Sequence, residues 1–359
     1  MSKGRTNPFL NSVHRIQRML GILVPACVAA TLAMLPSIPS RAAADDLATC
    51  SQEAAETFIP ACTAVITSAE RSSHEKAQAY ISRGNGYYNI KGNYDQALQD
   101  YDSAIALDPS NTVALYNRGN IRTSVGQYEK AIADYTKAIE LNPKYANALN
   151  NRCFAYNARG DYERALDDCH RAIKFDPSQA NTYVGLGNAL NQKSEYDKSL
   201  KAYDDALRLD TKNAKAYLGR CSVYIKISRF SNAIEACGQA IQLDAKDPTG
   251  WNNRCWARAI IGDLPSALLD CNQALELQSN DPYSLDSRAL VYLKMGKYDK
   301  AVADYGQALL VQPGRTTSLY GQGVAKLKQG DAAGGNEEIN LAKRGDPSIA
   351  DRFREYGVQ

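Results

Sequence analysis

The sequence is poor in the residues on which most catalytic and metal sites depend. Its 359 residues include three histidines, and only His74 and His170 lie beyond residue 44. Zinc sites and nucleophilic triads draw on histidine, so no metal centre and no Ser-His-Asp or Cys-His arrangement is predicted. The sequence also lacks a Cys-x-x-Cys motif and a glycine-rich phosphate loop. We therefore expect no catalytic residues, no metal and no cofactor.

Long apolar runs are missing beyond the N-terminal region. The one long run spans residues 19–35 and is interrupted by Pro25. A basic segment without acids precedes it and three alanines follow it, which is the pattern of a cleaved secretory signal. We predict that residues 1–44 are a signal peptide, cut after Ala44, and that the protein is periplasmic or secreted, without stable membrane insertion after cleavage. Two alternatives stay open: a retained anchor, for which about 17 apolar residues are marginal, and a lipoprotein cleaved before Cys27.

An excess of charge of one sign is missing too. Residues 1–44 carry five Lys and Arg and no acid, which leaves 37 basic against 39 acidic residues in the rest of the chain. Binding to nucleic acid or to an anionic membrane would favour a strongly basic surface. The mature chain therefore gives no reason to predict a nucleic-acid partner, and we expect a protein or peptide instead.

What the sequence does contain is one unit repeated. The pattern Gly-x-Tyr, with Ala three residues after the Tyr, begins at Gly92, Gly126 and Gly160, a step of 34 residues. Such a period is the signature of a repeat architecture. The units span residues 112–145, 146–179, 180–213, 214–247, 248–281 and 282–315, with a first unit at 77–111 and a degenerate eighth at 316–348.

Each unit has the apolar spacing of two helices. Leu149, Cys153 and Tyr156 follow the i, i+4, i+7 pattern of one helix face. A Gly-Asp turn at residues 160–161 separates the two helices, and Asp-Pro at 176–177 ends the second. Each unit is therefore predicted to be an antiparallel pair of helices, each of about 13 residues. One pair cannot bury its apolar face alone, so the units should stack into a solenoid.

With this period, and with Gly-Asp-Tyr, small residues and Pro at fixed places, residues 77–348 resemble the tetratricopeptide repeat (TPR) family. The resemblance implies an all-α, right-handed superhelical solenoid of about eight antiparallel helix-pair repeats. It also implies a concave face that is lined by first helices and holds peptides or partner proteins. Around the solenoid we predict a helical lead-in at residues 45–76 and a C-terminal capping helix at 349–359 over its open end.

Cysteines occur in pairs at fixed places. Counting from the start of each unit, three units carry Cys at both the eighth and the twenty-fourth place, and the others carry it at neither. The two places are symmetric about the turn, so facing Cα atoms should come within about 4–6 Å, which is disulfide distance. Redox chemistry or zinc binding by the same thiols are the alternatives. The predicted structural disulfides are Cys153–Cys169, Cys221–Cys237 and Cys255–Cys271, with Cys50–Cys62 in the lead-in.

Arginine and aspartate are paired in the same way. Five units carry Arg at the seventh place and Asp at the twenty-third, whereas the fourth unit carries Leu186 and Ala202 and the fifth carries Arg220 and Ala236. Matched charges of this kind favour internal ion pairs, and a row of arginines for binding anions is the alternative. The predicted pairs are Arg83–Asp100, Arg118–Asp134, Arg152–Asp168, Arg254–Asp270 and Arg288–Asp304.

Asparagine and aromatic residues occupy the fifth, sixth and ninth places of the first helices, with Asn157 and Asn191 one turn further on. An amide both donates and accepts, so such residues can hold a peptide backbone. We predict a non-catalytic exported scaffold that binds a peptide or partner protein in its concave groove. The alternatives are a thiol-disulfide redox protein, or an accessory subunit that recruits an envelope complex or an enzyme through its convex face. The candidate binding residues are Asn85, Tyr116, Asn117, Asn120, Asn150, Asn151, Phe154, Asn188, Asn252, Asn253 and Trp256.

Overall fold

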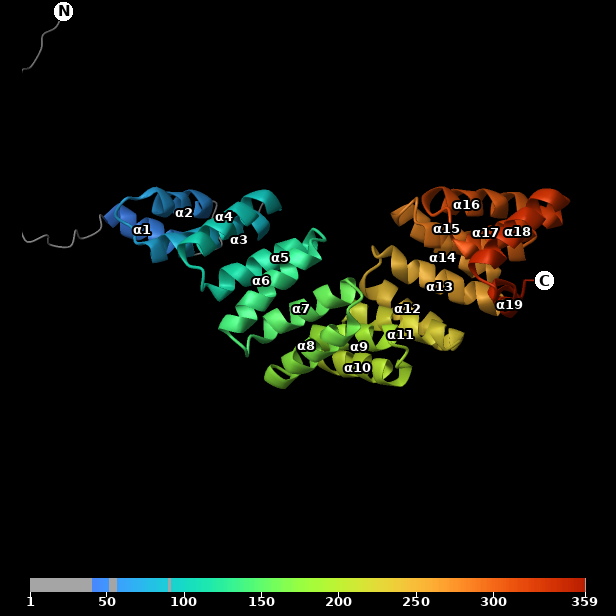
Figure 1. Ribbon diagram of the computed structural model, residues 1–359, viewed down its shortest axis with the longest axis horizontal. Helices are drawn as coiled ribbons and strands as arrows, with labels where there is room; N and C mark the ends of the chain where they lie inside the picture. Colours follow the sequence, from blue (N-terminus) through green and yellow to red (C-terminus); the bar gives the residue numbers. More distant parts are fainter. Residues whose placement is uncertain (1–40, 52–56, 90–91, 359) are drawn as a thin grey trace, which may run out of the picture.

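The computed structural model describes residues 41–51, 57–89 and 92–358, and over these residues it is built of nineteen helices without a strand (Figure 1). The predicted all-α class is confirmed. Residues 1–40 of the predicted signal peptide lie outside the described residues. Helix α1 (Arg41–Cys50) begins before the predicted cleavage point after Ala44.

Eight consecutive helix pairs make up the body of the chain, and each helix packs on its partner and on the next pair. The first helices are α3 (Ser73–Asn89), α5 (Thr112–Ser124), α7 (Ala146–Ala158), α9 (Ala180–Gln192), α11 (Ala214–Lys226), α13 (Pro248–Ile261), α15 (Pro282–Lys294) and α17 (Thr316–Gln329). The second helices are α4 (Tyr94–Leu107), α6 (Tyr128–Leu141), α8 (Tyr162–Phe175), α10 (Tyr196–Leu209), α12 (Phe230–Leu243), α14 (Leu264–Leu277), α16 (Tyr298–Val311) and α18 (Ala332–Gly345).

The pairs are stacked so that first helices touch first helices. Helix α7 contacts α9, α9 contacts α11, and α11 contacts α13, whereas successive second helices in the described part of the chain make no such contact. A stack that is closer on one side curves toward that side. The first helices therefore line the concave face, and the second helices form the convex one.

Local chemistry sets the helix ends. Before the first helix of a pair, Asn111 accepts a hydrogen bond from the backbone N–H of Ala114, and before a second helix Asp161 does the same for Arg164. These are N-caps. Within each pair the chain turns through one residue in the left-handed region, with φ of 76° at Gly126 and at Gly160. Ser194 and Ser228 occupy that position in two units, with φ of 61° and 58°.

In the first seven pairs the interior is filled in one of two ways. In some units a tyrosine at the twenty-fourth place is fully buried and faces glycine at the eighth; a Cβ added to Gly119 would lie 2.6 Å from the Tyr135 ring. In three units two cysteines fill the same space. Cys153 and Cys169, for example, are fully buried with Cα atoms 5.5 Å apart.

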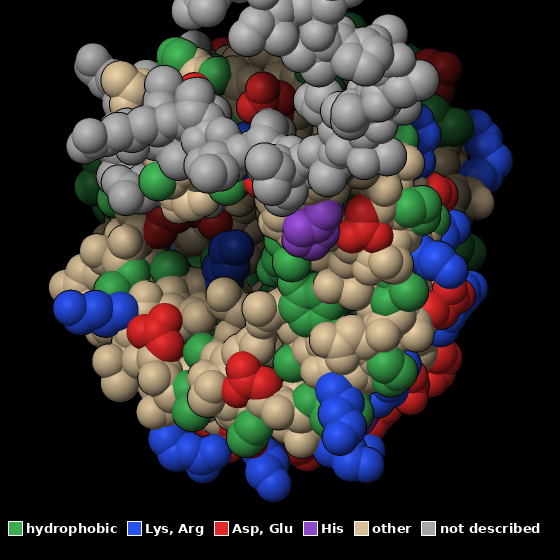
Figure 2. Space-filling model, turned by 90° about the vertical axis from the view of Figure 1, so that its left-hand side faces the viewer, with side chains coloured by type: hydrophobic (Ala, Val, Ile, Leu, Met, Phe, Trp, Pro, Cys, Tyr) green, Lys and Arg blue, Asp and Glu red, His purple; other side chains and the backbone are tan. Residues whose placement is uncertain are grey.

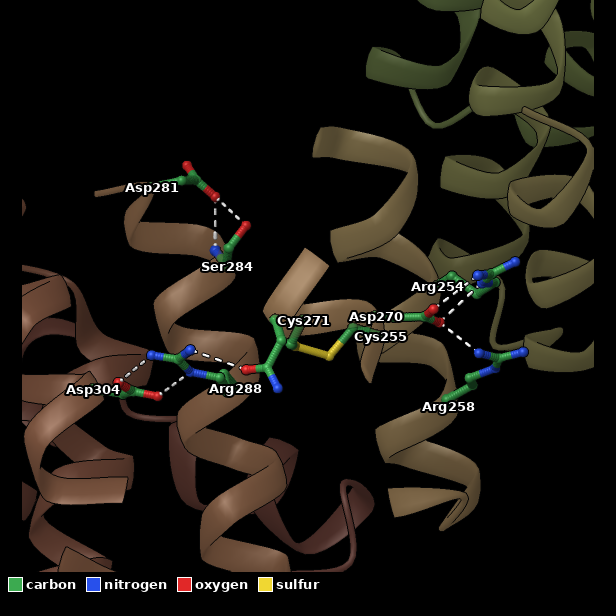
Figure 3. Close-up of a disulfide and its surroundings, with 10 residues drawn as sticks. Arg254, Cys255, Arg258, Asp270, Cys271, Asp281, Ser284, Arg288 and Asp304 are labelled. Atoms are coloured by element: carbon green, nitrogen blue, oxygen red, sulfur yellow. Dashed lines mark hydrogen bonds and ion pairs between the residues drawn. A yellow bond between two sulfur atoms is a disulfide. The ribbon is translucent and has the colours of Figure 1, made fainter. Parts of the chain in front are cut away.

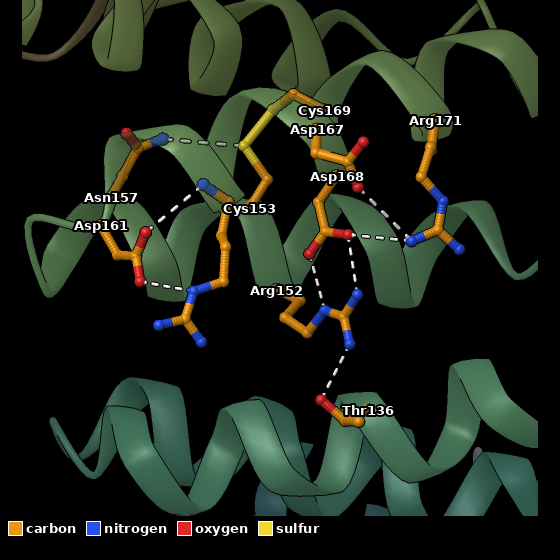
Figure 4. A network of polar contacts seen from close by, with 10 residues as sticks. Thr136, Arg152, Cys153, Asn157, Asp161, Asp167, Asp168, Cys169 and Arg171 are labelled. Carbon is orange, nitrogen blue, oxygen red and sulfur yellow. Dashed lines mark hydrogen bonds and ion pairs between the residues drawn. A yellow bond between two sulfur atoms is a disulfide. The ribbon is translucent and has the colours of Figure 1, made fainter.

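All four predicted cysteine pairs lie at disulfide-bonding distance, two of them drawn in Figures 3 and 4. Their Cα–Cα distances lie between 4.7 and 5.5 Å. The first bond joins α1 to α2 (Phe58–Thr67), so the lead-in is a short hairpin that packs on α3. The pairs are Cys50–Cys62, Cys153–Cys169, Cys221–Cys237 and Cys255–Cys271.

The C-terminal segment does more than cover the last pair. Helix α19 (Ile349–Glu355) is shorter than the predicted 349–359, and the chain beyond it reaches back along the concave face. The Phe353 ring lies 4.7 Å from that of Tyr320, and the Tyr356 ring lies 5.5 Å from that of Trp256. Lys294 Nζ donates to the Tyr356 carbonyl at 2.7 Å. A sequence pattern shows which residues are apolar, but it does not show which groove accepts them.

The surface carries both signs of charge. In the end view of Figure 2, lysines and arginines alternate with aspartates and glutamates around the visible face. None of the helices in the described ranges combines the length and apolar character that a bilayer crossing requires.

Candidate binding groove on the concave face

Two adjoining hollows on the concave face form what we call the central groove. One has a volume of about 570 Å³ and the other about 450 Å³, and Phe154 and Lys215 line both. The groove crosses first helices from α3, which contributes Tyr88, to α13, as the resemblance implied. Its lining includes Asn120, Asn150, Asn151, Phe154, Asn157, Asn188, Asn191, Lys215, Ser222 and Asn253.

The ninth-place asparagines do not offer free side-chain oxygens to this groove. The hydroxyl of buried Tyr135 donates to Asn120 Oδ1 at 2.8 Å, and Tyr203 donates to Asn188 Oδ1 at 2.7 Å. Burial raises the pKa of both tyrosines, so both stay protonated donors. Tyr101 bonds Asn85 in the same way. These asparagines position the tyrosines, and their carbonyl oxygens are already engaged.

Two sixth-place asparagines extend these bonds to the next unit. Asn117 Nδ2 donates to Asn85 Oδ1 at 2.9 Å, and Asn151 Nδ2 donates to Asn120 Oδ1 at 2.7 Å and to the Tyr116 hydroxyl at 3.2 Å. Chains of tyrosine, asparagine and asparagine therefore tie neighbouring repeats together.

These chains were not predicted, although the sequence carries a signal for them. Asn occurs at the ninth place in three units whose twenty-fourth place is Tyr. Where the twenty-fourth place is Cys, the ninth holds Phe154, Ser222 or Trp256. In these six units the ninth-place residue follows what fills the interior of its own pair, whereas the seventh unit carries Leu290 with Tyr305.

Unpartnered amide oxygens lie elsewhere in the central groove. Asn157 and Asn191 occupy the twelfth place of successive units, and the Oδ1 of each is buried without a hydrogen-bond partner among the described residues. Asn157 Nδ2 donates to the Gly185 carbonyl at 2.9 Å, which leaves its oxygen for another donor. Asn150 Oδ1 is also buried and unpartnered. Buried acceptors without donors are costly, so these three oxygens are the groups in the groove that most require a donor.

The remaining candidates separate into two places. Asn253 lines the central groove, and it also borders a smaller cavity near the C-terminus that contains Asn252 and Trp256. Tyr116 packs against Tyr145 at a ring distance of 5.2 Å. The structure therefore brings Asn120, Asn150, Asn151, Phe154, Asn188 and Asn253 together, whereas Asn85, Tyr116, Asn117, Asn252 and Trp256 do not line the central groove.

Five of the six arginines at the seventh place form internal ion pairs with the predicted aspartates, whereas Arg220 faces Ala236 and reaches Asp204 only at 3.5 Å. Arg152 Nε and Nη2 donate to the two carboxylate oxygens of Asp168 at 2.6 and 2.8 Å (Figure 4). Its third nitrogen, Nη1, donates to the Thr136 hydroxyl in the preceding unit. Figure 3 draws the same fork at Arg254–Asp270 and Arg288–Asp304. The bond to Asp304 raises the pKa of Arg288. The guanidinium groups of these pairs are occupied, which leaves no open anion-binding row on this column.

Two observations in the described ranges bear on metal binding and on thiol chemistry. No three His, Cys, Asp or Glu side chains converge there as metal ligands. The six cysteines of the repeats are fully buried.

Comparison with curated protein sequences gave no significant match. Solved structures share the fold. A chain of the APC/C hetero-tetramer Cut9–Hcn1 is similar, with a TM-score of 0.62 and 16% identity over 89% of the present chain. The present chain spans 63% of the length of that Cut9–Hcn1 chain. A tetratricopeptide repeat protein from Parabacteroides merdae has a TM-score of 0.55 and 18% identity, over 74% of this chain and 98% of that one. Pseudomonas aeruginosa PilF has a TM-score of 0.51 and 20% identity, over 60% and 98%.

Family models match the repeats directly. One tetratricopeptide repeat model matches residues 112–145 and 146–179, and a second matches residues 184–248 and 287–348. A TPR repeat model matches residues 84–123. The matched segments cover more than half of the chain and follow the helix pairs. The chain belongs to the tetratricopeptide repeat family.

Proposed function

We propose that the protein is an exported, non-catalytic scaffold that binds an extended segment of a partner protein in its central groove. The observation that carries this proposal is the pair of unpartnered oxygens Asn157 Oδ1 and Asn191 Oδ1 in a hollow of about 570 Å³. First helices pack roughly 10 Å apart, which is about three residues of an extended chain. Backbone N–H groups of a bound segment are donors that fit these acceptors.

The composition of the groove supports a peptide over other ligands. Its walls combine amides with Phe154 and the exposed cation Lys215, and Asp247 lies at the edge. This mixture suits a backbone together with a few side chains, whereas a nucleic acid would favour clustered cations.

Export is supported by the four cysteine pairs at bonding distance. Disulfides persist in oxidising compartments and are rare in the cytosol. Together with the basic, apolar and alanine-rich N-terminal sequence, they favour the periplasm or the exterior.

Site-specific crosslinking in the native compartment tests the groove. A photoreactive residue placed at Ser222, on α11, should crosslink to a partner protein. The double variant Asn157→Ala, Asn191→Ala should lower that partner's recovery about tenfold or more, because each lost amide leaves a peptide group unpaired at about 1 kcal/mol.

The matched control is the convex face. Photoreactive residues at Lys137 and Lys201, both on second helices, should give no crosslink to the same partner. Crosslinks from these two positions alone would contradict groove binding and favour the accessory-subunit alternative, in which partners dock on the convex face.

A further inference from the structure

A second, smaller cavity lies near the C-terminal end and is separate from the residues that carry the proposed peptide site. It is lined by residues of α13, α15, α16, α17 and the segment around α19, which Figure 1 colours from gold to red toward the C-terminus. Its volume is about 230 Å³. Apolar walls come from Trp256, Leu290 and Phe353, and the polar side is formed by Asp286, Arg315 and Thr317.

Four residues that line this cavity each have a polar atom that is buried without a partner in the part of the chain that the structure describes. These atoms are Asn252 Oδ1, Tyr305 Oη, Arg315 Nε and Thr317 Oγ1. Tyr305 is 1% exposed, so its hydroxyl cannot turn to bulk water. In the other tyrosine-containing units the equivalent hydroxyl bonds an asparagine, but here the ninth place is Leu290. Buried groups of this kind are normally paired, which indicates that something is missing from the cavity.

Arg315 differs from the arginines of the ion-pair column. Those arginines hold their aspartates at 2.6–3.1 Å through two nitrogens. Arg315 reaches Asp286 Oδ2 and Gln312 Oε1 only at 3.5 Å, and its guanidinium lies 4.3 Å from the centre of the Tyr283 ring. A half-buried guanidinium without a close acceptor favours an anion.

Asp286 and the start of helix α17 both set the charge in this cavity. Asp286 Oδ1 accepts from Ser318 Oγ at 2.5 Å, so one carboxylate oxygen is already held by a hydroxyl donor. Burial raises the pKa of the Asp286 carboxyl, and Arg315 opposes that rise. Helix α17 begins directly after Arg315, which supplies no side-chain cap. The first-turn N–H groups of that helix therefore add partial positive charge.

We propose that this cavity binds a small organic carboxylate. Its carboxylate oxygens accept from Arg315 Nε–H and from the Thr317 hydroxyl. A donor on the ligand faces Asn252 Oδ1 and the Tyr305 hydroxyl oxygen, and the apolar body of the ligand packs against Trp256 and Phe353. The cavity is smaller than the roughly 300 Å³ at which pockets for drug-sized ligands begin. The occupant is therefore the size of a metabolite.

Titration calorimetry on the full mature protein tests the proposal. The probes are acetate, phenylacetate and 4-hydroxyphenylacetate, with neutral 4-hydroxyphenylacetamide as the matched control. We expect affinity to rise from acetate to 4-hydroxyphenylacetate, as apolar body and donor are added, and the amide to bind at least about tenfold more weakly than its carboxylate. Quenching of Trp256 fluorescence should follow the same binding curve.

Paired variants separate binding from folding. Arg315→Gln should weaken 4-hydroxyphenylacetate by about tenfold or more. Thr317→Val should weaken it several-fold, whereas its neighbour Thr316→Val should not. Tyr305→Phe should weaken binding without lowering the melting temperature of the free protein, because its hydroxyl has no protein partner; Tyr203→Phe should lower the melting temperature and leave binding unchanged.

The proposal fails if no carboxylate of the series binds saturably, or if the amide binds as tightly as its carboxylate. It also fails if Arg315→Gln and Thr317→Val both leave affinity unchanged. A crystal structure grown with 10 mM 4-hydroxyphenylacetate that shows only ordered water on the four unpartnered atoms would overturn it as well. None of these outcomes bears on the central groove, since the segment-binding test uses different residues.

Discussion

At the scale of single residues, the residue type at one place of a helix pair depends on the residue type at the facing place. Glycine at the eighth place leaves room for the ring of Tyr135, and a cysteine there requires a second cysteine. In five units arginine at the seventh place is matched by aspartate at the twenty-third, whereas the fifth unit carries Arg220 with Ala236. The reason is the same in each case: the two side chains share one small space between two helices, and either alone would leave a void or an unpaired charge.

The pairing predicts a specific double-mutant cycle at Arg152. Asp168 is 1% exposed, so Arg152→Leu leaves a buried carboxylate whose remaining cationic neighbour is Arg171 at 3.4 Å. We expect this single change to cost about 3 kcal/mol of unfolding free energy. The double variant Arg152→Leu, Asp168→Ala should recover at least about 1 kcal/mol of that loss, measured by urea denaturation.

The fourth unit is the internal precedent for this result, because it carries Leu186 and Ala202 at the same two places. Ala202 is buried there without a charge to satisfy. If the single and double variants lost stability equally, the fork would contribute only packing and the ion-pair interpretation would be wrong.

At the scale of the helix pair, the turn between the two helices requires one residue with positive φ. Glycine meets this requirement in most units, and it adopts the left-handed region without steric penalty. Ser194 and Ser228 adopt the same conformation at φ of 61° and 58°. A side chain in that region is disfavoured by roughly 1 kcal/mol.

Ser194→Gly should therefore stabilise the protein. The gain is partly offset by the greater freedom of glycine in the unfolded chain and by loss of an exposed hydrogen bond between Ser194 and Tyr196 at 3.2 Å. We expect a net gain of about 0.5 kcal/mol in chemical denaturation. The mirror change Gly160→Ser, at φ of 76°, should lower stability. A loss of stability in Ser194→Gly would mean that the hydrogen bond outweighs the strain.

Much of the fold at this scale was predictable from the sequence. The 34-residue period, the turn and the Asp-Pro ends predicted helices close to those observed, because each signal acts within a few residues. The cysteine and arginine pairs were predictable because one turn relates their partners. The tyrosine–asparagine chains were not predictable in this way, because they depend on contacts between units. The packing of Phe353 and Tyr356 against first helices was not predictable either, because it depends on tertiary geometry that no local pattern carries.

At the scale of the whole molecule, the solenoid combines units closed by tyrosine with units closed by cysteine. In such a stack each unit contacts only its neighbours, so stability is close to a sum of local terms. Three units depend on a covalent bond inside the pair, at α7–α8, α11–α12 and α13–α14. Units at α5–α6 and α9–α10 depend instead on Tyr135 and Tyr203.

Reduction should therefore loosen the molecule unevenly. Each of these bonds closes a loop with a sequence separation of 16, which in the chain-entropy model stabilises by about 3 kcal/mol. Hydrogen–deuterium exchange after reduction should rise in α7–α8, α11–α12 and α13–α14, and far less in α5–α6.

Before reduction, the six repeat cysteines should resist a thiol reagent and millimolar glutathione, because all six are fully buried. Labelling of two or more of them in the native protein would instead favour the thiol-disulfide redox alternative, since exchange chemistry requires access to sulfur. Uniform loosening on reduction would show that the bonds stabilise the stack as a whole, and the local description of its energetics would have to be abandoned.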